Sequence, residues 1–221
     1  MKLLISALTK FILGLLLVGA LLFIPAGTVA YPNAWLFIGL LFVPMLLLGA
    51  VLLIVSPALL KKRLDSKENE STQKGLVAVS ALIFLIGFTV AGLDFRFGWS
   101  HVPVWVVITA SVILLVSYAL YAEVMRENAY LSRTVKIQDG QKVIDTGLYG
   151  IVRHPMYAVT VWLFLSIPVV LGSWWALLCF LPYIPVIAVR TVNEEKLLEA
   201  GLNGYTDYKK RVKYQIIPFI W

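Results

Sequence analysis

Two polar clusters interrupt the apolar C-terminal half of the chain and contain residue types that could do chemistry. The first is the stretch Gly147-Leu-Tyr-Gly-Ile-Val-Arg-His-Pro-Met-Tyr157, which combines two phenols, a guanidinium and an imidazole. The second, Arg190-Thr-Val-Asn-Glu-Glu195, ends the last apolar run. A membrane helix needs neither cluster for its own stability, so we expect both clusters to meet and form one active site.

The second cluster contains a basic and an acidic residue at helical spacing. Arg190 and Glu194 are four residues apart, so on a helix they share a face and can pair with each other. The alternative interpretation is an interfacial ion pair at the point where a span leaves the bilayer. Glu195 points about 100° away from Glu194 and therefore has the weaker case for a role.

The first cluster contains a helix start. Pro155 is typical of the first turn of a helix and holds the preceding residue in an extended conformation. Arg153 and His154 would then lie beside free backbone N–H groups, which suit an anion or a carboxylate. The alternatives are a structural His-Pro pair and, for Tyr149 and Tyr157, membership of an aromatic belt.

The sequence contains none of the common motifs for nucleotide, zinc or serine-nucleophile sites. It lacks the glycine-rich nucleotide loops, the zinc-binding His-Glu-x-x-His pattern and a serine nucleophile elbow. Two histidines and one cysteine make a metal site improbable. The residues that follow the fourth apolar run could line a pocket or merely cap the bundle. These residues are Glu123, Arg126, Glu127 and Asn128.

The composition indicates an integral membrane protein. Hydrophobic residues make up 60% of the chain and charged residues 14%, against about 25% charged residues in soluble domains. A chain of 221 residues has room for several spans but not for a separate soluble domain, so we expect one membrane domain over residues 1–221. The net charge of +7 fits membrane topology and anionic lipids rather than nucleic acid.

The apolar runs predict an all-α polytopic bundle with about six transmembrane helices, because a span needs about 20 apolar residues. Four spans lie within residues 1–122, and residues 123–221 form the catalytic part with a loop, a helical hairpin joined at Gly172 and an amphipathic C-terminal helix. Residues 56–74 are expected to form a charged loop. The predicted spans are 3–24, 34–55, 75–93, 103–121, 157–171 and 173–189.

Basic residues set the predicted orientation. With six spans, eighteen of the 19 Lys and Arg residues fall on one side and only Arg96 falls on the other. Cytoplasmic loops carry the excess of Lys and Arg in membrane proteins. We therefore expect both termini and both polar clusters to face the cytoplasm.

Taken in order, the motifs resemble a known family. Gly147-Leu-Tyr149, Arg153-His-Pro-Met-Tyr157, Arg190-x-x-x-Glu-Glu195-x-x-Leu and Tyr205-x-x-Tyr208-Lys-Lys-Arg-Val212 resemble the isoprenylcysteine carboxyl methyltransferases, whose wider group includes phospholipid N-methyltransferases. The resemblance covers roughly residues 128–221. It implies S-adenosyl-L-methionine bound without a Rossmann fold, in a cytoplasmic pocket closed by loops and the C-terminal helix.

The resemblance also implies roles for individual residues. Glu194 would hold the methionine part of the cofactor and Arg190 would address the substrate, which makes these two the catalytic candidates. A strand-like segment would lie against the cofactor through its backbone, and a second set of residues would line the pocket. The segment is Gln141, Lys142, Val143 and Ile144, and the lining residues are Tyr149, His154, Pro155, Met156 and Tyr157.

The methyl acceptor stays open at this level. We expect a lipophilic acceptor whose carboxylate is methylated, because a carboxylate needs no general base; a lipid amine or a small thiol would have to lose a proton. The alternative from another enzyme class is an NADPH-dependent membrane sterol or lipid reductase. A transporter is disfavoured, because the middle of each predicted span lacks charge. Participation of Glu195, Asn128, Lys136 and Arg153 is left open.

Overall fold

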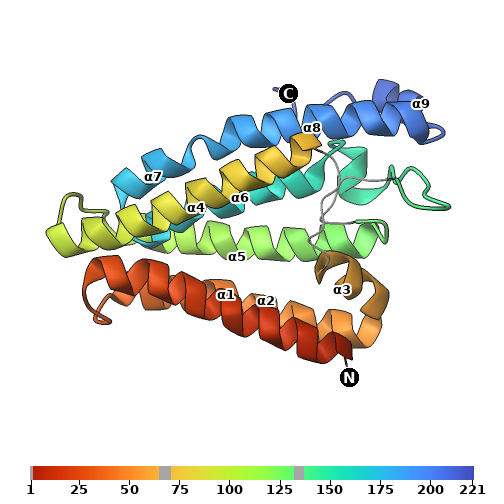
Figure 1. Ribbon diagram of the computed structural model, residues 1–221. Coiled ribbons are helices and arrows are strands. Elements are labelled where there is room, and N and C mark those ends of the chain that lie inside the picture. The colour runs from red at the N-terminus through yellow and green to blue at the C-terminus, as the bar shows by residue number, and fades with distance from the viewer. Residues whose placement is uncertain (1, 65–70, 132–136) are drawn as a thin grey trace.

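The computed structural model describes residues 2–64, 71–131 and 137–221, and within these ranges all regular structure is helical. The all-α prediction is therefore confirmed (Figure 1). The helices are α1 Lys2–Ala26, α2 Pro32–Val55, α3 Pro57–Leu64, α4 Ser71–Phe97, α5 Val104–Glu127, the 3₁₀ helix η1 Gly147–Gly150, α6 Pro155–Val170, α7 Trp174–Phe180, α8 Tyr183–Gly201 and α9 Tyr205–Arg211.

All six predicted apolar runs form helices, but they differ in length. In the described part of the chain, five helices are long and apolar enough to cross a membrane, with α7 and α8 counted together as Trp174–Gly201. The remaining run, α6, has 16 residues and falls short of the ~20 that a span needs. The predicted hairpin is confirmed, because α6 packs on α7 and Gly172 makes the turn with φ 80°.

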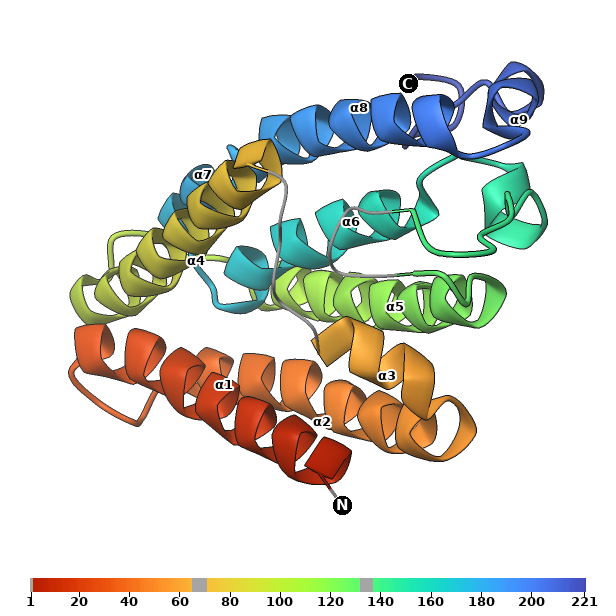
Figure 2. The ribbon, with the colours of Figure 1, turned by 45° about the vertical axis from the view of Figure 1, so that its right-hand side comes forward.

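The helices pack around one apolar core. Helix α5 runs along α6, and α4 contacts both α1 and α7. Phe84 and Phe180 meet edge to face at 5.1 Å between ring centroids inside this core. Figure 2 shows α1 and α2 as one layer beside α5 and α6, with α8 on the far side of α6.

The charged loop predicted for residues 56–74 is wrong in part, because most of its described residues are helical. Pro57 starts α3, and proline suits the first position of a helix. Leu59 and Leu60 are buried, so tertiary packing stabilises this short helix. The acidic residues expected in that loop, Asp65, Glu68 and Glu70, lie outside the described residues.

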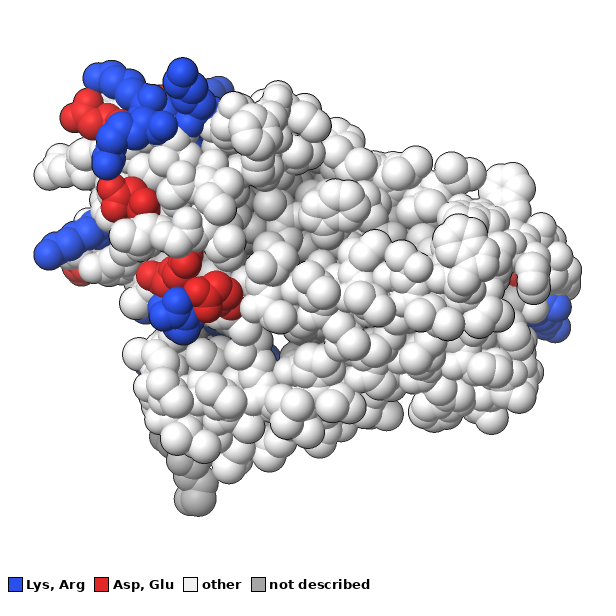
Figure 3. Space-filling model, turned by 180° about the vertical axis from the view of Figure 1, so that it is seen from behind, with Lys and Arg blue, Asp and Glu red and all other residues white. Residues whose placement is uncertain are grey.

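Charged side chains gather at one end of the bundle. On the face in Figure 3, a broad zone without charged side chains separates this end from a few charged atoms at the other end. At that other end the buried carboxylate of Asp94 accepts hydrogen bonds from Ser100 N at 2.8 Å and Ser173 Oγ at 2.5 Å. These bonds join the end of α4 to the start of α7.

Candidate active site

An open cavity lies at the charged end of the bundle, between α5, the start of α6, α8 and α9. It holds about 830 Å³ of empty space, including the part open to solvent. The structure brings ten of the predicted site residues to its wall. They are Gln141, Lys142, Val143, Ile144, Tyr149, His154, Met156, Tyr157, Arg190 and Glu194. Pro155 does not line the cavity; it is buried as the first residue of α6.

A phenol connects the two catalytic candidates. Arg190 Nε donates to Tyr157 Oη at 2.9 Å, and Tyr157 Oη donates to Glu194 Oε2 at 2.5 Å. Tyr157 is buried, so its position is fixed by packing within the core. Helix spacing predicted that Arg190 and Glu194 share a face, but the bridging role of Tyr157 depends on the packing of α6 against α8.

The end of α5 positions Tyr149. Both carboxylate oxygens of Glu127 accept from Leu148 N, at 3.2 and 3.0 Å, and Asn128 Nδ2 donates to Tyr149 Oη at 2.9 Å. Gly147 has φ 54°, and a Cβ there would overlap the Glu127 carboxylate. Burial raises the pKa of Tyr149 to about 12, so its phenol is neutral at physiological pH. Asn128 therefore lines the cavity, whereas Glu127 does not line it and instead binds the backbone of the adjacent turn.

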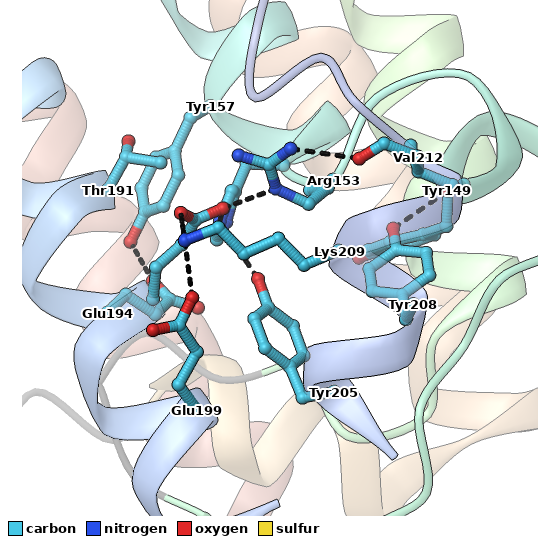
Figure 4. A network of polar contacts seen from close by, with 12 residues as sticks. Tyr149, Arg153, Tyr157, Thr191, Glu194, Glu199, Tyr205, Tyr208, Lys209 and Val212 are labelled. Carbon is cyan, nitrogen blue, oxygen red and sulfur yellow. Dashed lines mark hydrogen bonds and ion pairs between the residues drawn. The ribbon is translucent and has the colours of Figure 1, made fainter.

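Glu195 lies at the centre of what we call the buried polar network, in which Glu195, Arg153 and His154 are buried and Lys209 joins from the surface with a 39% exposed side chain. Glu195 Oε1 is 2.5 Å from Arg153 Nε and 3.3 Å from His154 Nε2, and Oε2 is 3.2 Å from Lys209 Nζ. Figure 4 shows Tyr205 and Lys209, both from α9, next to Arg153, which lies just before α6. Glu195 therefore does not line the cavity, and its angle on α8 directs it toward α9 and the start of α6.

The backbone N–H groups of the two residues that precede α6 are occupied. Arg153 N and His154 N donate to the carbonyls of Tyr214 and Gln215, each at 2.9 Å. Arg153 Nη1 also donates to the carbonyls of Val212 and Lys213, at 2.8 and 2.7 Å. The C-terminal segment thus packs against the residues that lead into α6.

The predicted amphipathic tail forms one wall of the cavity. Tyr205, Tyr208 and Val212, which stand at helical spacing in the sequence, are all buried. Tyr208 Oη donates to the carbonyl of Tyr149 at 2.7 Å, and Gly204 with φ 83° turns the chain from α8 into α9. Lys136 lies outside the described residues.

Sequence reasoning missed several residues of the cavity wall. All of them are apolar or aromatic, and for those on or next to α8 and α9 the only signal was helical spacing. They are Tyr130, Leu131, Leu197, Leu198, Leu202, Tyr205 and Tyr208. Asn128 and Arg153, whose participation the sequence left open, also line the cavity.

Residues 104–202, which contain both polar clusters, match the phospholipid methyltransferase family model. The predicted family resemblance is confirmed. The fold is similar to that of the eukaryotic intramembrane Ras methyltransferase, isoprenylcysteine carboxyl methyltransferase, with a TM-score of 0.56 and 19% identity. This match covers 92% of the present chain and 74% of the other. No curated protein matches the chain in sequence. Family and fold together indicate a membrane methyltransferase.

Proposed function

We propose that the protein transfers a methyl group from S-adenosylmethionine to the carboxylate of a lipophilic acceptor, at the cytoplasmic face of its membrane. The observation that carries this proposal is the chain of hydrogen bonds Arg190–Tyr157–Glu194 on the wall of the cavity. It places a carboxylate and a guanidinium at fixed positions around one buried phenol. An acid and a base in that arrangement suit a cationic ligand and an anionic one side by side.

The donor set of the cavity fits the cofactor. Glu194 would bind the α-ammonium group through a charge-assisted hydrogen bond. The rings of Tyr149, Tyr205 and Tyr208 line the same cavity, and aromatic faces attract a cation such as a sulfonium. Residues 141–144 have no regular structure and lie along the wall, which suits the role in which their backbone faces the cofactor.

The chain's own residues would then orient the acceptor and keep water out. Bound S-adenosylmethionine supplies an electrophilic methyl group on a positively charged sulfur. Arg190 would hold the acceptor carboxylate through a two-pronged hydrogen bond and so align one oxygen for attack. Leu197, Leu198 and Leu202 contribute an apolar wall, and a dry site favours a reaction in which opposite charges disappear.

Acceptors other than a carboxylate would need a proton acceptor in the site. A lipid amine or a small thiol would have to lose a proton before attack, and the phenol of Tyr157 already donates its proton to Glu194. A carboxylate acceptor needs no such transfer. The reductase alternative loses support, because the family match is to phospholipid methyltransferases.

Calorimetric titration of S-adenosylhomocysteine into detergent-solubilised protein tests the proposal. We expect saturable binding by the wild type. Glu194→Ala should weaken it by about 10- to 100-fold, because a hydrogen bond to a charged group contributes about 1.5–3 kcal/mol. Glu199→Ala is the matched control, since it removes a carboxylate from the same helix that does not line the cavity, and its affinity should stay unchanged.

Two results would reject the proposal. The first is the absence of S-adenosylhomocysteine binding by the wild type, and NADPH binding in its place would point to the reductase. The second is an equal loss of affinity in Glu194→Ala and Glu199→Ala. Arg190→Lys completes the design: it should retain S-adenosylhomocysteine affinity while losing methyl transfer, because lysine cannot form the two-pronged contact.

A further inference from the structure

After α9 the chain folds back on itself in residues 216–221, which we call the C-terminal hook. Ile216 N and Ile217 N both donate to Trp221 O, at 2.9 and 2.8 Å, and Trp221 N donates to Ile217 O at 3.0 Å. Ile216 is buried in the core cluster that also contains Ile187 of α8. The hook is therefore a fixed element of the fold, anchored in the core at its first residue.

The hook presents apolar side chains to its surroundings. Phe219 is 86% exposed and Ile220 79% exposed, and Ile217 and Trp221 are exposed as well. Phe219 has φ 66°, a left-handed conformation that residues with a Cβ rarely adopt. Its ring contacts that of Tyr214 at 5.2 Å between centroids. An exposed apolar patch of this kind marks a contact with a partner or a membrane, and strained backbone conformations persist where they have a function.

The position of the hook along the bundle matches the headgroup layer of a membrane. Figures 1 and 2 show the C-terminus beside α8, set back from α9 toward the middle of the bundle. The last turn of α9 carries Lys209, Lys210 and Arg211, whereas the earlier turns of α8 expose Ile184 and Val189. The hook thus lies between a charged surface and an apolar one, which is the level where aromatic side chains are enriched in membrane proteins.

The residues that lead into the hook are basic. Residues 205–221 contain four basic residues and one acidic residue. Lys209, Lys210 and Arg211 pair with carboxylates, but Lys213 is exposed and forms no ion pair within the described part of the chain. Lysines near a membrane surface attract anionic lipids. An anionic phospholipid headgroup would therefore complement Lys213 while the apolar side chains of the hook contact the acyl chains.

The hook is connected to the cavity through the segment that joins it to α9. The carbonyls of Tyr214 and Gln215 accept from Arg153 N and His154 N, each at 2.9 Å. Gln215 is buried, and Arg153 and His154 both line the cavity. A contact that holds the hook in place therefore also holds this part of the cavity wall, because the hook and the segment are one continuous stretch of backbone.

We propose that the C-terminal hook inserts into the headgroup layer of the leaflet at the charged end, beside anionic phospholipids, and that this contact stabilises the cavity wall formed by Arg153 and His154. The lipid contact is independent of the proposed methyl transfer, whereas its effect on the cofactor rests on that function. Because lipid and cofactor both favour the state with the hook in place, each raises the affinity for the other.

A fluorophore on the hook tests the contact directly. Cys179→Ser removes the one native cysteine, and Ile220→Cys provides the attachment point for an environment-sensitive label. Quenching by acrylamide, which is uncharged, is measured in phosphatidylcholine nanodiscs with and without phosphatidylglycerol. We expect phosphatidylglycerol to shield the label at position 220. Thr206→Cys is the matched control, because this neutral residue of α9 is also exposed, and its label should stay accessible in both lipids.

Replacement of single lysines tests the preference for anionic lipid. The shielding of the hook label is followed while phosphatidylglycerol is titrated into neutral maltoside micelles. Lys213→Gln should raise the midpoint about fivefold, since a lysine near an anionic surface contributes about 1 kcal/mol. Lys61→Gln is the control. It removes an exposed lysine of α3, which Figures 1 and 2 place across the bundle from the C-terminus, and should change the midpoint by less than about twofold because salt screens distant charges.

S-adenosylhomocysteine titration measures the coupling to the cavity. Phosphatidylglycerol should raise the affinity of the wild type by about fivefold or more. Phe219→Ser should remove this gain. Phe97→Ser should keep it, because it changes an exposed phenylalanine at the opposite end of the bundle. Since coupling is reciprocal, S-adenosylhomocysteine should lower the phosphatidylglycerol midpoint of the wild type by the same factor.

Each step has an outcome that would overturn it. A label at position 220 as accessible as the label at position 206 would reject insertion. Equal shielding in neutral and anionic nanodiscs, or equal effects of Lys213→Gln and Lys61→Gln, would reject the anionic partner. A gain in cofactor affinity that survives Phe219→Ser would reject the coupling. If the hook label is shielded while the wild type binds no S-adenosylhomocysteine in any lipid, the methyltransferase function fails and the lipid contact stands.

Discussion

Replacement of Glu195 by alanine tests the buried polar network most directly. The side chains of Glu195 and Arg153 are each 7% exposed, and their charged atoms lie 2.5 Å apart. Removal of one partner from a buried ion pair costs about 3–5 kcal/mol, because the other charge stays buried without compensation. Arg153 would keep its bonds to the carbonyls of Val212 and Lys213, so we expect about 3 kcal/mol, the lower end of that range.

Thermal unfolding in detergent, followed by tryptophan fluorescence, measures this loss. For a chain of this size, 1 kcal/mol shifts the Tm by about 2–4 °C, so Glu195→Ala should unfold about 6–12 °C below the wild type. Glu199→Ala is the matched control, because Glu199 also pairs with Lys209 but its side chain is 37% exposed. An exposed pair contributes about 0–1 kcal/mol.

Equal Tm shifts in these two variants would refute the reasoning, since they would show that burial of Glu195 has no energetic consequence. A double variant provides a second test. Glu195→Leu combined with Arg153→Met replaces the ion pair with apolar side chains, and such replacements are often neutral or stabilising. It should therefore unfold above Glu195→Ala.

Two further predictions concern the turn that carries Tyr149. Gly147 and Gly140 both have positive φ, but only a Cβ at Gly147 would meet a neighbour, the Glu127 carboxylate. Gly140→Ala should therefore cost about 1 kcal/mol in the free energy of unfolding by denaturant. Gly147→Ala should cost about 2–3 kcal/mol, because it also displaces a hydrogen-bonded carboxylate; equal costs would contradict the contact. The raised pKa of Tyr149, about 12, predicts stability that is complete below about pH 10 and is lost as the pH rises toward 12, because only the unfolded state ionises in that window. The Tm of Tyr149→Phe should fall less than that of the wild type between pH 9 and 11.5. An equal fall in both proteins would show that ionisation of Tyr149 does not contribute to the loss of stability.

The sequence by itself determined the long apolar helices and the two polar clusters, whereas the short helix α3 was not predicted. An apolar run long enough to cross a bilayer must satisfy its own backbone hydrogen bonds, so its helical state depends little on its neighbours. The spacing of Arg190 and Glu194, and of Tyr205 and Tyr208, placed each pair on one side of its helix for the same local reason. The family resemblance rested on these ordered motifs, and the match over residues 104–202 agrees with it.

Only the tertiary structure decided what each side chain meets. Helical geometry gave the direction of Glu195, but its burial depends on α9 and on Arg153, which lies 42 positions away in the sequence. The N–H groups of Arg153 and His154, just before α6, have no local partner; the carbonyls of Tyr214 and Gln215 reach them only after the chain has folded back. Burial and pairing are properties of contacts between distant segments, and the local sequence does not determine those contacts.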